Sequence, residues 1–266
     1  MLHGGAVAAL LAQGFEAAAR EVGLRPVRLG VDLFRPVPAK PLLRRSRTLR
    51  RGRRLALLES VLHCEGRAVA RGSALLLDDG SPPLVPEGSP PEGPEHLEDA
   101  ALYPAAIADR VPPGFHRHLA IRFGVHEGEP LLWVHPQPAL FHGVGMTPLV
   151  VAAASADLVY AATVLPALHA QNPAWGSDGR LGKPYINADT TLYLERPPAG
   201  EWMALKARPL VAHGRCAVVE VSVFDTQGRL GSATQALLEN PSPGESELQP
   251  RGPASPSSVS TKETRS

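Results

Sequence analysis

The sequence has little cysteine and no excess of charge of either sign. Among its 266 residues, Cys64 and Cys216 are the two cysteines, and they stand far apart with no second thiol or paired histidine beside them. This usage excludes a disulfide framework or a zinc knuckle and is typical of a reducing compartment, so we predict a cytoplasmic protein. Lys and Arg number 27 against 26 Asp and Glu. So small a net charge gives no overall field that selects nucleic acid or an anionic membrane.

Long apolar runs are also missing. No run approaches the roughly 18 residues of a membrane span, so we predict no membrane partner. The alanine-rich start, residues 6–19, has no basic segment before it and contains Gln13 and Glu16. These features are not those of a signal peptide, and we expect no export.

Two familiar kinds of catalytic site are not indicated. No Gly-x-Ser-x-Gly elbow is present, which argues against serine hydrolysis on an α/β-hydrolase scaffold. His116 and His118 would share one face of a strand, and His126 and His135 follow, but no carboxylate or third ligand has matching spacing. We therefore predict neither a metal nor another cofactor.

Two segments have the composition of buried helices. Residues 6–19 are rich in good helix formers and apolar around most of the cylinder. Residues 146–162 are similar, with Thr147 as the predicted N-cap and Pro148 at the first helical position. A helix as apolar as the first needs a sheet around it from its first residue, so we expect that a preceding strand is missing.

The rest of the chain alternates between predicted strands and breaks. The predicted strands are 27–35, 41–50, 54–64, 68–77, 118–125, 131–136, 202–210, 216–224, 230–238, and one that begins at Tyr185 and ends at Arg196-Pro-Pro198. Residues 78–114 are dense in proline, glycine and acidic residues, which predicts a linker. Residues 171–183 read as an irregular loop. After Asn240, the tail 241–266 is predicted to be disordered.

One pattern of elements occurs twice. A helix is followed by a strand ending in Arg-Pro and then by three strands, and the glycines at 52 and 66 recur at 214 and 228, a shift of 162 each time. A duplication explains this better than chance. We predict an α+β fold of two units, residues 1–77 and 115–240, each an antiparallel sheet wrapped around a central helix. We expect the two sheets to join edge to edge, so that neither unit leaves the edge of a strand unpaired at the join.

The strand from Tyr185 carries the first candidate for a catalytic base. Read with a period of two, Asp189 and Thr191 fall on the face opposite Ile186 and Leu192. An Asp within a strand is disfavoured by propensity and asks for a reason. A solvated or hydrogen-bonded Asp is the simpler interpretation. The alternative is a base that takes a proton from a water held by an amide such as Gln235 on the last strand, where the first unit has Ser73. This asymmetry predicts one active unit and one structural unit.

Three stretches together resemble a known family. They are His3-Gly4-Gly5, the run from Asn187 to Trp202, and the run from Asp225 to Leu238. They look like the thioesterase-like, double-hotdog relatives of acyl-CoA thioesterase II, and the likeness covers residues 1–240 except the linker. It implies a double hotdog fold, hydrolysis of acyl-CoA, and a water activated by an Asp, a Gln and a hydroxyl residue.

By position, this resemblance makes Asp189 the Asp and Gln235 the Gln. The place of the hydroxyl falls near Pro209 and Leu210, so Thr191 is considered as a substitute. The resembling hydratase branch would have a His five residues after Asp189, where this chain has Leu194.

Backbone amides at a helix start are the predicted donors to the oxyanion. A thioester carbonyl gains negative charge on attack, and such amides stabilise it without an ionised side chain. His3-Gly4-Gly5 and the turn Gly143-Val-Gly145-Met146 are the two candidates, and an ordinary helix start is the alternative for each.

The basic run 44–54 is dense enough to suggest nucleic acid. It straddles a predicted turn at Gly52 and has no interleaved aromatic residues. A solvated hairpin is therefore the simpler interpretation, and a contact with the phosphates of CoA is the better functional one.

The sequence as a whole predicts hydrolysis of an acyl-CoA thioester to free acid and CoA. The alternative is a hotdog protein that binds acyl groups without turning them over, which the displaced hydroxyl and the missing strand favour. The expected partner is the acyl-CoA substrate, and self-association into a homo-oligomer is also expected.

Overall fold

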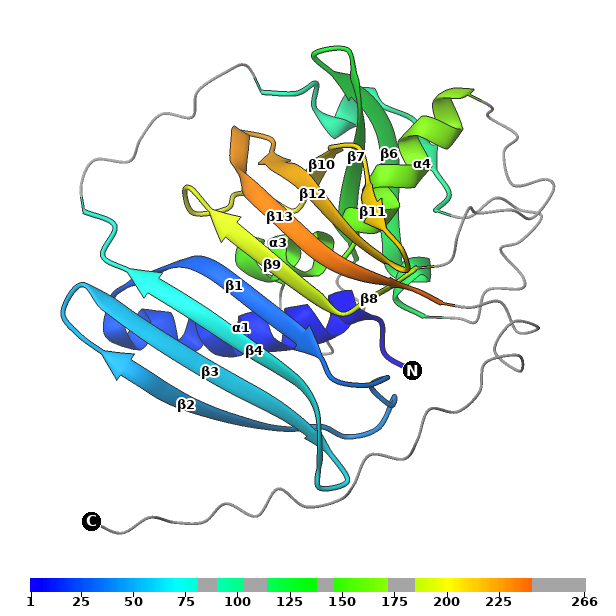
Figure 1. Ribbon diagram of the computed structural model, residues 1–266. Coiled ribbons are helices and arrows are strands. Elements are labelled where there is room, and N and C mark those ends of the chain that lie inside the picture. Colours follow the sequence, from blue (N-terminus) through cyan, green and yellow to red (C-terminus); the bar gives the residue numbers. More distant parts are fainter. Residues whose placement is uncertain (81–89, 103–113, 138–145, 172–184, 241–266) are drawn as a thin grey trace, which may run out of the picture.

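A single antiparallel sheet runs through the chain and holds two groups of elements together (Figure 1). The computed structural model describes residues 1–80, 90–102, 114–137, 146–171 and 185–240. Within these residues the sheet has 13 strands, in the order β2-β3-β4-β1-β9-β13-β12-β10-β7-β6-β5, with β11 beside β12 and β8 beside β13. The described strands thus form one continuous sheet, whereas two antiparallel sheets joined edge to edge were predicted.

The first group of elements is α1 (Gly4–Val22), β1 (Arg25–Leu33), β2 (Leu43–Arg51), β3 (Leu55–Cys64) and β4 (Arg67–Leu77). The second group is η1 (Pro94–His96), β5 (Asp99–Ala100), η2 (Phe115–His118), β6 (Leu119–His126), β7 (Glu129–Pro136), α3 (Pro148–Ala156), α4 (Val159–Gln171), β8 (Tyr185–Asn187), β9 (Asp189–Leu194), β10 (Met203–Ala207), β11 (Val211–His213), β12 (Cys216–Asp225) and β13 (Gly228–Glu239). Every strand predicted from alternation is present, with its ends moved by a few residues.

The two groups meet at β1 and β9. These strands pair antiparallel from Arg28 opposite Tyr193 to Asp32 opposite Asp189. The pairing gives each strand a partner on both sides, since β4 lies beyond β1 and β13 beyond β9. The predicted edge-to-edge join is therefore present, and it leaves no open strand edge between the groups.

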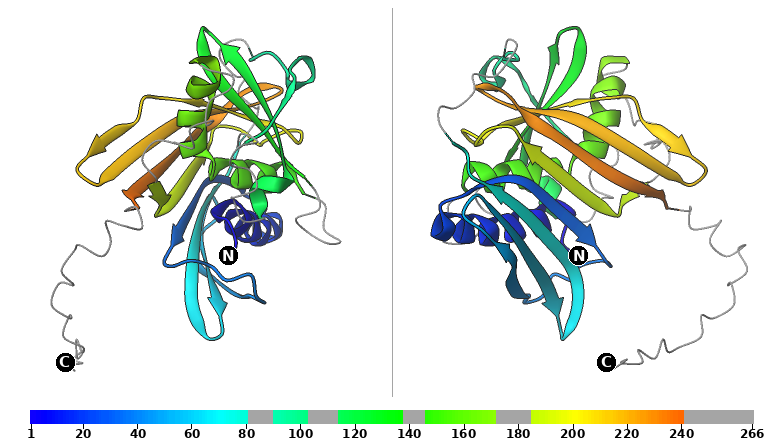
Figure 2. Two further views of the ribbon diagram at one scale, coloured as in Figure 1. Left: turned by 90° about the vertical axis from the view of Figure 1, so that its right-hand side faces the viewer. Right: turned by 60° about the vertical axis from the view of Figure 1, so that its left-hand side comes forward.

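Helices α1 and α3 lie on the same face of the curved sheet (Figure 2). Helix α1 ends at Val22 and is capped by Gly23, whose left-handed φ of 66° suits glycine and whose N–H bonds the carbonyls of Ala19 and Arg20. Helix α3 starts as predicted, with Thr147 as its N-cap and Pro148 in its first turn. One cluster of buried apolar side chains joins both helices to the sheet. The two groups therefore share a core.

The predicted helix 146–162 is broken in two. It ends as α3 at Ala156 and resumes as α4 at Val159, and the axes differ by 62°. Asp157 and Leu158 form the break. Among the described residues, no single helix has the length and apolar composition to cross a membrane, and α3 and α4 reach that length and composition only as this bent pair.

Part of the predicted linker packs against the sheet. Strand β5 pairs with β6, the indole Nε1 of Trp133 donates to the carbonyl of Glu92 at 3.1 Å, and Arg122 donates to the carbonyl of Pro94. Pro94 and Leu102 are buried. A proline-rich segment suits this place because it covers a sheet edge without needing ladder donors. The predicted tail, residues 241–266, lies outside the described residues.

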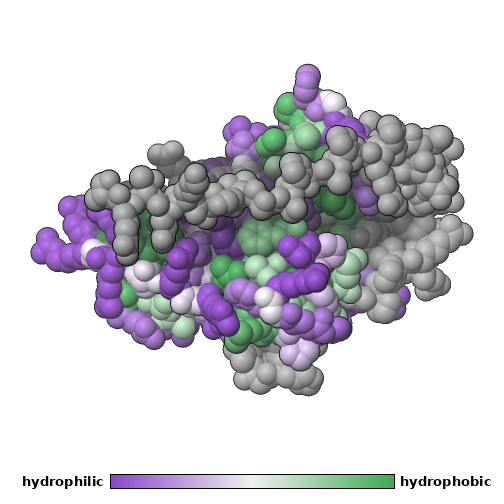
Figure 3. All heavy atoms as spheres, turned by 60° about the horizontal axis from the view of Figure 1, so that its bottom comes forward, coloured by the Kyte–Doolittle hydropathy of each residue, from purple (hydrophilic) through white to green (hydrophobic). Residues whose placement is uncertain are grey.

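The basic run forms an exposed hairpin at the far edge of the sheet. All of β2 is exposed, and the guanidinium of Arg47 lies 2.6 Å from the carboxylate of Glu59 on β3. Figure 3 faces this lower side of the molecule and shows hydrophilic side chains with smaller apolar patches between them. Strands β3, β4 and β1 separate β2 from β9.

His116 and His118 lie in the 3-10 helix η2 and do not share a strand face as predicted. Their side chains follow a helical turn because the chain bends there before β6 begins. Within the ranges that the structure describes, no group of three His, Cys, Asp or Glu residues could hold a metal.

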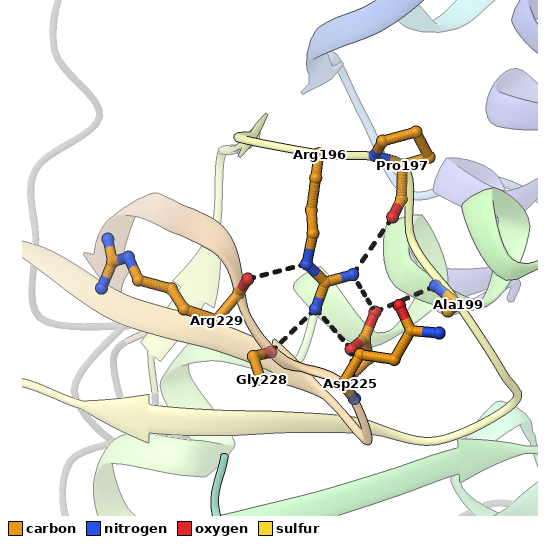
Figure 4. A network of polar contacts seen from close by, with 7 residues as sticks. Arg196, Pro197, Ala199, Asp225, Gly228 and Arg229 are labelled. Carbon is orange, nitrogen blue, oxygen red and sulfur yellow. Dashed lines mark hydrogen bonds and ion pairs between the residues drawn. The ribbon is translucent and has the colours of Figure 1, made fainter. Parts of the chain in front are cut away.

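A buried ion pair fixes the loop after β9 (Figure 4). Arg196 contacts the carboxylate of Asp225 through Nη1 at 2.7 Å and Nη2 at 2.5 Å, and it also donates to three backbone carbonyls. The backbone N–H groups of Ala199 and Gln227 donate to the same carboxylate. The side chain of Asp225 is 0% exposed. Arg196 thereby ties the loop to the β12–β13 turn.

We predict that Arg196→Ala lowers the free energy of unfolding by about 3–5 kcal/mol, because it leaves the carboxylate of Asp225 buried without its cation. Arg208→Ala is the matched control, since Arg208 is 70% exposed and pairs with Glu220 on the surface. It should cost about 1 kcal/mol or less. Urea denaturation checks both values. Equal losses for the two variants would contradict the structural role of the buried pair.

Candidate active site

Asp157 is a buried carboxylate at the break between α3 and α4. Its side chain is 3% exposed. Three side-chain donors in the described part of the chain surround it: His3 Nδ1 lies 2.8 Å from Oδ2, while Asn187 Nδ2 and Thr190 Oγ1 lie 2.5 Å and 3.4 Å from Oδ1. A buried charge needs such partners, because burial without them is costly. The site therefore combines the residue before α1, the break between α3 and α4, and strands β8 and β9.

Gln235 on β13 is 1% exposed and holds the other side of this cluster. Its Oε1 accepts from the backbone N–H of Tyr160 at 3.1 Å. Its Nε2 donates to the carbonyl of Asp157 at 3.0 Å and to the hydroxyl of Thr190 at 2.9 Å. The backbone partners fix the orientation of the amide, since an N–H requires an acceptor and a carbonyl a donor. Thr190 thus receives a hydrogen bond from Gln235 and is left to donate its proton to Asp157.

A bulge at the start of β9 brings Asn187 and Thr190 to the same face. Asn187 pairs with Leu237 and Thr191 pairs with Thr234, so residues 188–190 oppose only the two residues 235 and 236. One extra residue reverses the alternation of side chains along a strand. Ile186 is accordingly 49% exposed, although its spacing from Leu192 predicted that both would share a face.

Asp189 lies at this bulge with its carboxylate directed to the backbone. Its Oδ1 accepts from the N–H of Ala236 at 2.7 Å, an exposed contact. Asp189 and Thr191 are partly exposed, whereas Thr190 between them is buried and contacts Gln235. The structure therefore brings Gln235 together with Asp157 and Thr190, and it gives Asp189 a backbone partner in the sheet ladder.

The start of α1 packs directly against Asp157. A Cβ on Gly4 would overlap Oδ1 of Asp157, and one on Gly5 would lie 2.8 Å from the carbonyl of Ala154. Only glycine fits so close an approach. The ring of His3 stacks on Phe115 with centroids 5.0 Å apart. The predicted group His3-Gly4-Gly5 therefore lies at the buried carboxylate.

His3 can use its Nδ1 in one of two ways. This atom lies 2.8 Å from Asp157 Oδ2 and 3.2 Å from the N–H of Gly5. A protonated Nδ1 donates to the carboxylate and cannot accept from Gly5, and the charge-assisted contact is the stronger. Burial lowers the pKa of His3, but the hydrogen bond and the negative charge of Asp157 outweigh it, so the net pKa is raised above 6.5.

The second predicted oxyanion turn is only partly described. Gly143 and Gly145 lie outside the described residues. Met146 is partly buried and packs against the core cluster.

Asp157 and Thr190 were missed from the sequence, although one signal was present. Asp157 is the only charged residue in the apolar stretch 146–165. Acidic side chains are rarely buried without a partner, so a lone acid in a core helix suggests a site. No comparable signal marks Thr190, because the bulge that turns it inward has no distinctive residue.

The chain matches two family models. Residues 1–77 match the acyl-CoA thioesterase N-terminal domain, and residues 80–238 match the acyl-CoA thioesterase C-terminal domain. This chain belongs to the acyl-CoA thioesterase family. The resemblance first seen in the sequence is thereby confirmed. None of the curated proteins compared with the chain matches it.

Solved structures support the same fold for this acyl-CoA thioesterase family member. A putative thioesterase from Novosphingobium aromaticivorans DSM 12444 is 20% identical, with a TM-score of 0.61 over 88% of this chain and 87% of that one. The tesB protein of Mycobacterium avium subs paratuberculosis is 17% identical, with a TM-score of 0.55 over 87% and 86%. A conserved protein with a hot dog fold from Alicyclobacillus acidocaldarius is 14% identical, with a TM-score of 0.51 over 82% and 80%. The chain therefore has a hotdog-like fold.

We predict that Gly4→Ala lowers the free energy of unfolding by about 1–3 kcal/mol, because its methyl group collides with the fixed carboxylate of Asp157. Gly14→Ala in the same helix is the control. The atoms nearest to its methyl group belong to the guanidinium of Arg44, an exposed side chain that can move, and alanine favours the helix by up to about 1 kcal/mol. Denaturation of both variants measures the difference. Equal free energies of unfolding for the two variants would show that a methyl group at position 4 fits beside the carboxylate of Asp157.

The raised pKa of His3 predicts a pH-dependent stability. Because the folded-state pKa lies above the unfolded value of 6.5, the contribution is full below that value and is lost as pH rises through the folded pKa. The substitution His3→Gln removes this contribution to stability. The melting temperature of the wild type should exceed that of the variant more at about pH 6 than at about pH 9. A difference that grows with pH would contradict the His3–Asp157 pairing.

Proposed function

We propose that the protein hydrolyses an acyl-CoA thioester to free acid and CoA, with Asp157 as general base. Family membership supports thioesterase activity in general. The observation that carries the assignment is the buried carboxylate of Asp157, to which Thr190 and Gln235 connect. These three residue types are the Asp, hydroxyl and Gln that the sequence resemblance implies, with Asp157 in place of Asp189 and Thr190 in place of Thr191.

A water on Asp157 is the nucleophile in this proposal. A carboxylate offers roughly four lone-pair positions, and three are taken by His3, Asn187 and Thr190. The water occupies the remaining one. Its oxygen attacks the thioester carbonyl carbon as its proton passes to Asp157. The C–S bond then breaks, and the CoA thiolate takes up that proton, which restores the carboxylate.

The first turn of α1 stabilises the oxyanion. The first amides of a helix have no acceptor within the helix, and they carry the positive end of its dipole. Gly4 and Gly5 provide these amides beside Asp157, and protonation of His3 releases the N–H of Gly5 from Nδ1. Backbone donors placed where charge develops lower the barrier without reorganising.

Gln235 and Thr190 act as positioning residues. The Gln235 amide bonds the N–H of Tyr160, the carbonyl of Asp157 and the hydroxyl of Thr190. The amide therefore holds the α3–α4 break against β13 and directs the hydroxyl of Thr190 to the carboxylate. The base is oriented through a chain of hydrogen bonds that starts in the sheet.

The two halves are two fused hotdog units in this proposal. The glycine shift of 162, the separate family matches of the halves and the β1–β9 join all support it. The alternative of acyl binding without turnover rested on a lost hydroxyl and on a missing first strand. Thr190 supplies a hydroxyl beside Asp157, which favours hydrolysis.

Asp157→Asn should lower kcat for acyl-CoA hydrolysis by about 10²–10⁴-fold, because an amide cannot accept the proton of water. Asp189→Asn is the matched control, with the same change of carboxylate to amide. Its Oδ1 can still accept from Ala236, so its kcat should stay within about twofold of the wild type. Thiol release measured with a chromogenic thiol reagent reports both rates. A large loss in Asp189→Asn with none in Asp157→Asn would reverse the assignment.

A further inference from the structure

Two cavities follow one another along the seam between α1 and α3. The first is a narrow apolar crevice of about 10 Å³ beside Thr190. Its lining includes Ala8, Ala12, Phe15, Ala153, Ala156 and Thr190. The second is an open groove of about 330 Å³, lined in part by Glu16, Arg20, Gly23, Pro148, Pro197 and Pro198.

The order of these features along α1 is fixed by residue number. Gly4 contacts Asp157, residues 8–15 line the crevice, and residues 16–23 line the groove. At 1.5 Å per residue, Phe15 lies roughly 16 Å along the helix from Gly4. Helix α3 runs beside α1 in the opposite direction, since Asp157 at its end meets Gly4 and Pro148 at its start lines the groove. The seam therefore leads from the candidate base to the groove.

Phe15 stands between the crevice and the groove. Its side chain is 2% exposed, and it lines the crevice but not the groove. The ring packs against Gly72 on β4, where an added Cβ would lie 3.0 Å from the Phe15 ring carbon Cε2. A side chain at position 72 would therefore press on the ring from the side of the sheet. Among the α1 residues that line the crevice, Phe15 is the nearest along the chain to the groove, which begins with Glu16.

We infer that the acyl chain of the substrate lies along this seam and that Phe15 limits its length, which selects medium-chain acyl-CoA. The inference rests on the proposed hydrolysis at Asp157. Apolar walls suit an acyl chain, and the reacting carbonyl belongs at the polar end beside Thr190.

Binding widens the seam. A cavity of about 10 Å³ holds little more than one water-sized probe, so the chain displaces side chains as it enters. Alanine side chains from both helices line the crevice, which is apolar except at Thr190. Separation of the helices here breaks contacts between small apolar side chains.

A longer chain meets a polar barrier beyond Phe15. Glu16 and Arg20 form an ion pair at 3.1 Å at the groove, and the carboxylate of Glu16 also accepts from Thr147. Pro197 and Pro198 form part of the groove wall and follow Arg196, which Asp225 holds in place. The ring of Phe15 therefore separates an apolar path from a charged surface.

The test compares hydrolysis of butanoyl-, octanoyl-, dodecanoyl- and palmitoyl-CoA by the full chain. The wild type should show its highest kcat/KM for octanoyl- or dodecanoyl-CoA. Phe15→Leu should raise the ratio of kcat/KM for palmitoyl- over octanoyl-CoA by about tenfold or more, because loss of ring volume opens the far end. Gly72→Ala should lower the same ratio, since its methyl group presses on the Phe15 ring and on Leu11, which both line the crevice.

Phe224→Leu is the control, because Phe224 lies in a separate apolar cluster and makes no part of the seam. Its chain-length profile should match that of the wild type. If the wild type is active and both Phe15→Leu and Gly72→Ala keep its chain-length profile, the role of Phe15 is overturned and the proposed hydrolysis stands. No hydrolysis of any acyl-CoA by the wild type would instead overturn the proposed function, and the inference with it.

Discussion

The contact between the first turn of α1 and the carboxylate of Asp157 is the constraint on which the site depends. Gly4 permits it because a side chain there would overlap Oδ1. The contact places helix-start amides beside the candidate base, and it sets His3 at 2.8 Å from Oδ2. It also starts the seam along which α1 and α3 pack. The shared sheet holds this arrangement, since β1 and β9 join the strands that follow each helix.

The two halves contribute unequally, yet neither contains the site alone. Asp157, Thr190 and Gln235 come from the second half, while His3 and the glycine amides come from the first. One active unit and one structural unit were expected from the sequence, because Gln235 has only Ser73 as its counterpart. The proposed site differs from this expectation, because the first half places donors at a carboxylate that the second half positions.

Much of the fold follows from local patterns in the sequence, and the site follows less well. The strands, the helix starts and the hairpin at Gly52 were predictable because alternation, capping residues and glycine act locally. The break at Asp157 and the bulge at 188–190 were not, because each depends on tertiary partners such as Gln235 and Ala236. A shift of one residue in register moved Thr190 inward in place of Thr191, which shows how sensitive face assignments are.

The central claim is that Asp157 activates water and does not attack the thioester itself. Single-turnover hydrolysis in water labelled with heavy oxygen, with enzyme in excess over acyl-CoA, distinguishes the two. A general base predicts that the label enters the free acid in the first turnover and that peptides containing Asp157 stay unlabelled. Unlabelled acid from the first turnover, with heavy oxygen later found in the Asp157 carboxylate, would contradict the account and indicate a covalent acyl-enzyme.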